Sequence, residues 1–143
     1  MRKILLYIIA IVVIAGSWFA YKAYTRTNED LENKKPEFII GSAALIGEFA
    51  KDTATANAKY IDKVIEVSGN IKMIDANGNP VVIALGSQGE MSSVLCSMDS
   101  THAEKYKGLK EGDLVTLKGI CTGGVTEEIF GTDVKLNRCV VKP

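Results

Sequence analysis

The sequence predicts a mainly β protein, in which five short strands close into a barrel behind an N-terminal helix, and a single transmembrane helix precedes both. Three observations support this fold class. Residues 4–21 form an apolar run without a charged side chain. Apolar side chains then recur at helical spacing within residues 42–59, and from residue 63 they alternate with polar ones, as in half-buried strands. The length of 143 residues leaves room for one such domain.

The apolar run is long enough to cross a membrane. At about 1.5 Å per residue, its 18 residues just span a hydrocarbon core of about 30 Å. Trp18, Phe19 and Tyr21 gather at its end, where aromatic rings prefer the lipid–water boundary. We therefore expect residues 1–24 to form a signal anchor that contacts the lipid bilayer through residues 4–21. A cleaved signal peptide is the alternative, because small residues near the end of the run would permit cleavage.

The basic residues around the run support two opposite membrane orientations. More of them follow the run than precede it, which favours retention of the C-terminal part inside the cell. An opening of Met, Arg and Lys before an apolar stretch is instead typical of export signals. Because a whole domain follows, we expect a single-pass membrane protein whose soluble domain lies outside the cytoplasm, in the periplasm.

Residues 25–41 connect the apolar run to the domain. They are charged and polar and include Pro36, so we expect a tether that holds the domain away from the membrane. The domain is expected over residues 42–143. Ser42 is placed to cap its first helix, which should continue to about residue 59. One apolar stripe of that helix consists of Leu45, Ile46, Phe49 and Ala50.

Five strands are expected after the helix. The first alternates apolar and polar residues, and the Asn77-Gly78 pair after it is typical of a hairpin turn because both residues tolerate positive φ. A polar stretch at 101–109 predicts a helical turn. The strands are expected at residues 63–73, 80–85, 92–98, 114–122 and 133–141. Five short strands, with a helical interruption between the third and the fourth, are typical of an OB-type Greek-key barrel.

Several segments resemble a known family. The opening half resembles the tRNA_anti-like family of bacterial OB-fold proteins in Phe49-Ala-Lys-Asp52, Ala56-Asn-Ala-Lys-Tyr60 and Lys63-Val-Ile-Glu-Val-Ser-Gly69. The closing half resembles it in Gly112-Asp113, Val115, Lys118-Gly119-Ile-Cys121-Thr-Gly123 and Asn137-Arg-Cys139. The match covers roughly residues 43–141. It implies the OB fold, an envelope location as in many members and, through the family's likeness to anticodon-binding barrels, nucleic-acid binding.

The three cysteines fall on the third, fourth and fifth predicted strands. In an OB barrel the fifth strand lies between the other two, so either Cys96 or Cys121 can face Cys139 across one strand spacing. We expect a disulfide between Cys121 and Cys139, which would close a loop of about 18 residues and add about 3 kcal/mol. The alternative is three buried thiols that act as small apolar residues.

No pattern of catalytic or metal-binding residues stands out. The single histidine, His102, lacks a matching nucleophile, and no Cys-x-x-Cys pair accompanies it. Gly123-Gly124 is not followed by a lysine or a helix start, which a phosphate-binding loop requires. We therefore expect no enzyme activity, no cofactor and no metal.

The candidate binding face is a basic stripe on the barrel. Its expected members are Lys63, Lys72, Lys118, Lys135 and Arg138. From residue 27 onward, however, 13 Lys or Arg oppose 17 Asp or Glu, which is the wrong sign for a protein that depends on phosphate contacts. The second and third strands also contain no aromatic residue on which a base could stack.

These observations predict a membrane-tethered OB-fold binding or interaction module of the bacterial cell envelope, without catalysis. We expect its barrel face and the hairpin at residues 123–132 to contact a protein, peptide or glycan. An OB-fold nucleic-acid-binding protein is the disfavoured alternative.

Overall fold

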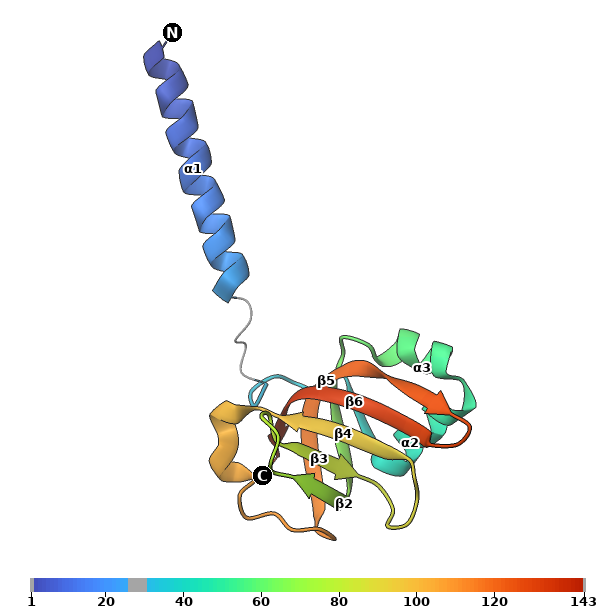
Figure 1. The fold of residues 1–143 in the computed structure, drawn as a ribbon. Helices are drawn as coiled ribbons and strands as arrows, with labels where there is room; N and C mark the ends of the chain where they lie inside the picture. Colours follow the sequence, from blue (N-terminus) through green and yellow to red (C-terminus); the bar gives the residue numbers. More distant parts are fainter. Residues whose placement is uncertain (1, 26–30, 143) are drawn as a thin grey trace. The chain divides into compact units, whose positions relative to one another are not determined.

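The computed structural model describes the backbone of residues 2–25 and 31–142, and the side chains of residues 11–22 and 31–142. The chain divides into two compact units, residues 1–30 and residues 31–143. The first contains one helix, and the second contains all the strands (Figure 1).

The first unit is formed by helix α1 (Arg2–Thr25), which includes the predicted apolar run. Its aromatic side chains Trp18, Phe19 and Tyr21 are exposed. Within the part of the chain whose side chains are described, no helix has the length and hydropathy that a membrane span requires. The predicted bilayer contact at residues 4–21 lies partly outside the described side chains, so it stays a prediction.

The second unit is a closed barrel of five strands, β2 to β6, with a sixth strand, β1, at its edge. Strand β1 (Phe38–Gly41) precedes helices α2 (Ser42–Lys51) and α3 (Thr53–Tyr60). The remaining elements, in chain order, are β2 (Val64–Asp75), β3 (Val82–Leu85), β4 (Ser93–Met98), the 3-10 helix η2 (Ser100–Lys105), β5 (Leu114–Glu127) and β6 (Gly131–Val141). The sheet order is β1-β2-β3-β4-β6-β5, and β2 also pairs with β5, which closes the barrel. The predicted fold class of the domain is thereby confirmed.

Strand β2 takes part in both halves of the barrel. Its first half pairs antiparallel with β5, and its second half pairs antiparallel with β3 after a register shift between Ile71 and Met73. β4 and β6 run parallel, which is possible because η2 and β5 lie between them in the chain. Alternate residues therefore point into one core, which includes Ile65, Val67, Ile83, Leu85, Val94, Leu117, Val134 and Leu136.

The predicted single helix over residues 42–59 is in fact two helices. Asp52 adopts an extended backbone conformation (φ −155°, ψ 92°) and accepts a hydrogen bond from the Thr55 backbone N–H at 3.1 Å, so it caps α3. The prediction that Ser42 caps the first helix is also wrong. Gly41 occupies the cap position without a side-chain bond, and Ser42 is a buried first-turn residue. Leu45 and Phe49 of the predicted stripe are fully buried in the barrel core, whereas Ile46 is half-buried and Ala50 is exposed.

The predicted tether at residues 25–41 is only partly separate from the barrel. Residues 26–30 lie outside the described part of the chain, but the compact unit begins at Leu31 rather than at residue 42. β1 extends the sheet by pairing parallel with residues 65–68 of β2. We call residues 31–37, which precede β1, the strap, because they lie against the barrel through contacts described below.

The predicted disulfide between Cys121 and Cys139 is not formed, and all three cysteines are free thiols. The register explains why, because Cys121 on β5 lies opposite Leu136, whereas Cys139 lies beside Met98 of β4. The thiols are fully buried in the core, as the alternative prediction has it. Burial raises the pKa of Cys121, and burial together with the adjacent Cys96 thiol raises the pKa of Cys139 well above its usual value.

Candidate binding surface

Lys118, predicted to belong to a basic binding stripe, is buried beneath the strap. Its ammonium group donates hydrogen bonds to the backbone carbonyl oxygens of Glu32 and Lys34, both at 2.8 Å. Only 7% of the residue is exposed. Beside it, Leu31 packs on Val64 and Val140 in a small apolar cluster on the outside of the sheet. Lys118 is therefore a structural residue that holds the strap in place.

Three further members of the predicted stripe also have partners within the protein. Lys63 forms an ion pair with Glu37 of the strap at 3.0 Å. The Arg138 guanidinium lies 3.9 Å from the Asp99 carboxylate. Lys72 donates to the Ser93 hydroxyl at 3.0 Å and to the Glu90 carbonyl oxygen.

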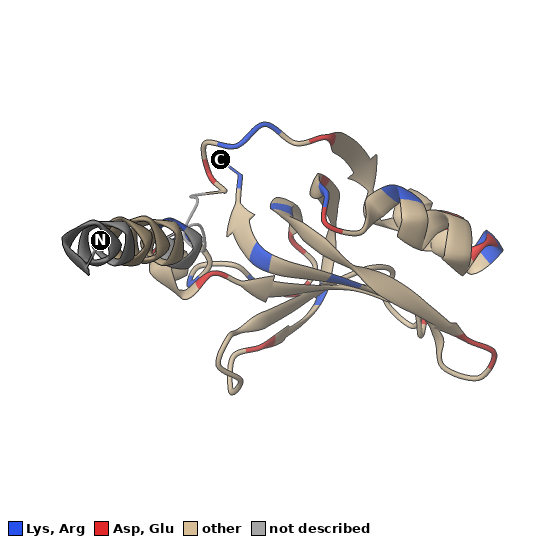
Figure 2. Cartoon of the chain, turned by 90° about the horizontal axis from the view of Figure 1, so that it is seen from above, with Lys and Arg blue, Asp and Glu red and all other residues tan. Residues whose placement is uncertain are grey.

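Lys135 differs from the other four. Its side chain is exposed on β6, and it makes no ion pair among the described residues. Four of the five residues are thus engaged within the protein, Lys63 and Lys118 both with the strap, and Lys135 alone lies on the outer half of the hairpin. Figure 2 shows basic and acidic positions interspersed over the barrel unit.

Glu32 of the strap collects several charged contacts. Its carboxylate lies 3.1 Å from His102 Nε2 and also contacts Lys105, both from η2. Among the described residues, no cluster of three or more His, Cys, Asp or Glu side chains could hold a metal. Because His102 contacts Glu32, it takes part in holding the strap to η2.

Helix α3 covers the outer edge of β5. The Asn57 side chain donates to the Gly124 carbonyl oxygen at 3.3 Å and accepts from the Gly124 N–H at 3.0 Å, as a neighbouring strand would. Gly123 permits this approach, since a Cβ there would lie 2.8 Å from the Asn57 side-chain oxygen, and Gly124 makes room for Phe49, from which a Cβ would lie 2.5 Å away. Thr126 adds a hydrogen bond to the Phe49 carbonyl oxygen. These contacts fix the outer half of the β5–β6 hairpin.

Large apolar side chains are exposed at this hairpin. The exposed fractions are 54% for Val125, 76% for Ile129 and 66% for Phe130. Met91, exposed by 67%, lies in the loop beside Gly131, as the close approach of Gly131 to residues 91 and 92 indicates. A shallow pocket here is lined by Val125, Glu127, Phe130, Gly131, Asp133 and Lys135.

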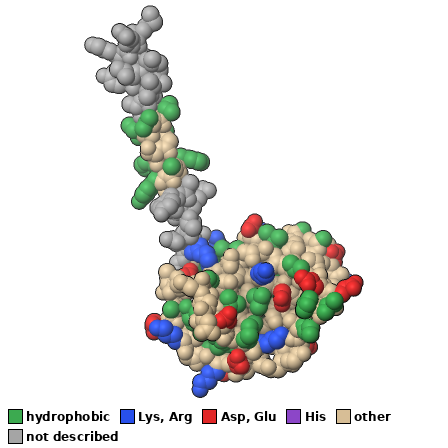
Figure 3. All heavy atoms as spheres, in the orientation of Figure 1, with side chains coloured by type: hydrophobic (Ala, Val, Ile, Leu, Met, Phe, Trp, Pro, Cys, Tyr) green, Lys and Arg blue, Asp and Glu red, His purple; other side chains and the backbone are tan. Residues whose placement is uncertain are grey.

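Acidic side chains surround these apolar residues. We define the hairpin surface as the apolar Met91, Val125, Ile129 and Phe130 together with the acidic Glu90, Glu127, Glu128 and Asp133. In Figure 3, hydrophobic and acidic side chains adjoin each other toward the end of the barrel that carries the β5–β6 hairpin. The sequence analysis expected the hairpin at residues 123–132 to contact a partner, but it named none of these side chains. Two large apolar residues at a hairpin turn, where polar residues are usual, are a signal that could have revealed them.

Phe130 is the exposed aromatic residue of the described barrel unit. Tyr60, by contrast, is buried between Phe38 and Phe49, with ring centroids 5.0 and 6.0 Å away. Its hydroxyl donates to Glu48, which also pairs with Lys59, and hydrogen bonds from Lys59 and Tyr60 lower the pKa of Glu48. This cluster supports the fold and offers no ring for stacking.

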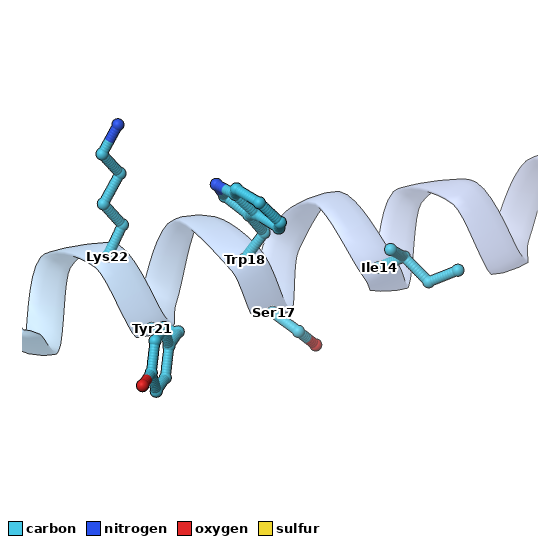
Figure 4. Close-up of a pocket in the computed structure, with 5 residues that line it drawn as sticks. All are labelled: Ile14, Ser17, Trp18, Tyr21 and Lys22. Atoms are coloured by element: carbon cyan, nitrogen blue, oxygen red, sulfur yellow. The ribbon is translucent and has the colours of Figure 1, made fainter.

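A further hollow lies on α1 alone. It is lined by Ile14, Ser17, Trp18, Tyr21 and Lys22. Figure 4 shows Trp18 and Lys22 pointing to one side of the helix and Ser17 and Tyr21 to the other. Because every lining residue comes from one helix, no facing wall encloses a ligand.

Comparisons with known proteins agree with this fold. The family model described as tRNA_anti-like matches residues 1–135. A lipoprotein of Klebsiella pneumoniae, whose name proposes nucleic-acid binding, has a solved structure that matches at 17% identity and a TM-score of 0.56. That match covers 73% of this chain and 91% of the lipoprotein, and it shows a shared fold. No curated protein sequence matches the chain.

Two further solved structures match at lower TM-scores. The OBody NL8, bound to hen egg-white lysozyme, shares 13% identity at a TM-score of 0.41, over 57% of this chain and 96% of the OBody. A chain assigned as an aspartyl-tRNA synthetase of Leishmania major shares 9% identity at a TM-score of 0.45, over 80% of this chain and 21% of that one. This chain thus spans about a fifth of the synthetase.

Proposed function

This chain belongs to the tRNA_anti-like family, and from that premise we propose that it is a non-catalytic OB-fold binding module of the bacterial cell envelope, tethered by its N-terminal helix, whose barrel binds a protein or peptide. One observation carries the choice of partner. Four of the five basic residues that could have formed a nucleic-acid face are engaged in contacts within the protein. Four large exposed apolar side chains of the barrel, those of the hairpin surface, instead lie among acidic ones.

The tether is part of the proposal. The apolar residues 4–21 fall within one continuous helix, and its aromatic side chains Trp18 and Phe19 are largely exposed. Burial of such a surface in lipid accounts for its composition. An export-type N-terminus supports a barrel outside the cytoplasm.

Nucleic-acid binding is the second candidate, because the Klebsiella lipoprotein with the same fold is named for it. Phe130 could stack on a base, and Lys135 could contact a phosphate. Acidic residues on both sides of Phe130 would repel the strand, however, and each phosphate contact needs a cation. We therefore rank this function below protein binding.

Two measurements on the full chain in nonionic detergent test the choice. We expect no saturable rise in fluorescence anisotropy when a labelled single-stranded oligonucleotide is titrated at low salt. We also expect photo-crosslinking from a reactive residue at position 125, carried out in native membranes, to give adducts with protein. Salt-sensitive oligonucleotide binding without a protein adduct would reverse the ranking of the two candidates.

Membrane topology needs an introduced thiol, because all three native cysteines are buried. Glu111 is exposed, so a Glu111→Cys variant provides a reactive site. We expect a membrane-impermeant maleimide to label this variant in intact cells whose outer membrane has been made permeable, while the wild-type protein stays unlabelled. Labelling only after lysis of the inner membrane would place the barrel in the cytoplasm instead.

A further inference from the structure

We infer that the hairpin surface binds a cationic segment of a partner protein, in which Lys or Arg residues stand beside apolar ones. The inference rests on the proposed function, because it assigns the site and the chemistry of the partner. It follows from the apolar centre of the surface, its rigidity and its charge.

The apolar centre has no role in the fold of the barrel. Ile129 and Phe130 form the turn between β5 and β6 and expose about three quarters and two thirds of their surface (76% and 66%). Turns favour small and polar residues, so neither side chain is explained by the turn itself. Adjacent apolar side chains rimmed by polar ones mark interaction sites on soluble surfaces. Met91 and Val125 extend this centre on the neighbouring loop and strand.

The base of the hairpin is anchored on both sides by hydrogen bonds. On one side of the hairpin, Asn57 hydrogen-bonds both backbone groups of Gly124. On the other side, the Thr132 N–H donates to the Ser92 hydroxyl at 3.0 Å, and the Thr126 and Thr132 hydroxyls lie 3.1 Å apart. A partner therefore meets an anchored hairpin, which limits the backbone entropy that is lost on binding.

The negative charge of the hairpin surface favours a cationic partner. Glu127 and Asp133 line the pocket beside Phe130, and Glu128 and Glu90 flank the apolar residues in sequence. Lys135 is the one cation in the pocket lining, and Lys72 contributes a second positive charge near the Glu90 carbonyl. Acidic groups therefore outnumber basic ones, which favours a cationic segment and disfavours phosphate. The face of the Phe130 ring also offers a cation–π contact to Arg or Lys.

Paired peptides provide the test. The probes are a short peptide of Lys, Arg, Leu and Trp and a counterpart in which Glu replaces each Lys and Arg. Both are titrated against the full chain in nonionic detergent by fluorescence anisotropy. We expect saturable binding of the cationic peptide only, with an affinity that falls as salt is added.

Variants locate the site. Phe130→Ala should weaken the cationic peptide about tenfold, as loss of a central aromatic contact does. The double reversal Glu127→Lys with Glu128→Lys should abolish its binding and allow the acidic peptide to bind. The matched control, Glu104→Lys with Glu111→Lys, carries the same change in net charge on exposed residues elsewhere and should leave binding unchanged. Because all these side chains are exposed, folding can be verified from an unaltered circular dichroism melting curve.

Each outcome decides the inference. Absence of cationic binding, equal binding of both peptides, or equal loss in the control overturns it. If crosslinking from position 125 still joins the barrel to a protein in membranes, the proposed function survives while the cationic chemistry assigned to its partner does not. If the oligonucleotide binds and no protein adduct forms, the proposed function itself fails.

Discussion

The two halves of β5 differ in whether another segment of the chain covers their outward-facing side chains. In its first half, Lys118 and its apolar neighbours are covered by the strap and are almost fully buried. In its second half, Val125 and the hairpin turn expose their apolar surface. The same strand thus contributes a site that the chain covers itself and a site that it leaves open. The comparison teaches that a basic or apolar residue on an outward-facing position is a ligand candidate only if no other segment covers it.

The largest expected contrast in stability lies between Leu31 and Ile129. Leu31→Ala removes a side chain that is 2% exposed and should lower the free energy of unfolding by about 2–3 kcal/mol. Ile129→Ala removes one that is mostly in water and should change it by less than about 0.5 kcal/mol. Urea unfolding of the full chain, followed by circular dichroism, measures both. Equal losses would mean that the strap does not stay on the barrel in solution.

Lys118 tests whether the strap depends on its ammonium group. Lys118→Met keeps the packing but leaves the carbonyl groups of Glu32 and Lys34 without this donor, so we expect a loss of about 2 kcal/mol. Hydrogen exchange should accelerate at residues 31–37 and remain slow in the hairpin. Lys107→Met, on an exposed side chain, is the control. Unchanged exchange of the strap would contradict the role assigned to Lys118.

Asn57 provides the corresponding test at the hairpin. Asn57→Ala removes both side-chain bonds to Gly124 and should cost about 1–2 kcal/mol. Exchange of the outer half of β5 should accelerate, and cationic peptide binding should weaken because the surface loses its order. Asn77→Ala, in an exposed loop, serves as the matched variant. Stable, slowly exchanging β5 amides in Asn57→Ala would show that α3 is dispensable for the hairpin.

The smallest expected effect is a loss of stability at acidic pH, which arises at Asp99, before η2. Hydrogen bonds from the Thr101 hydroxyl and backbone N–H, aided by Arg138 and His102, lower the pKa of Asp99, which caps η2. The ionised form is therefore favoured in the folded state. Its contribution to stability is present above the unfolded pKa of about 3.9 and is lost as the pH falls through the folded value. Asp99→Asn should flatten this acid-dependent decline, and parallel curves for the two proteins would refute the assignment.

Much of the barrel could be predicted because its pattern is local. The alternation around Ile65 and Val67 and the Asn77-Gly78 turn depend on neighbouring residues, and the structure confirms the five strands that they predict. The end of β5 was placed too early, at residue 122 instead of Glu127. Its glycines suggest a turn in sequence, whereas in the structure they make room for Phe49 and Asn57.

The binding residues were less predictable, because their roles depend on contacts between distant segments. Lys118 and Lys135 look alike in sequence, yet one lies beneath residues 86 and 84 positions earlier in the chain and the other remains exposed. The pairing of the cysteines likewise depends on contacts between distant segments. Their positions on adjacent strands were foreseen, but register shifts near Lys118 and Cys121 decide which residues face each other.

The sequence by itself determined the class of the domain, the order of its strands and the apolar character of residues 4–21, since these follow from periodicity and composition. Only the tertiary structure decided which outward-facing residues remain accessible. The strap buries Lys118, α3 covers the edge of β5, and the turn leaves Ile129 and Phe130 in water. Accessibility is a property of packing between segments, and no local pattern contains it.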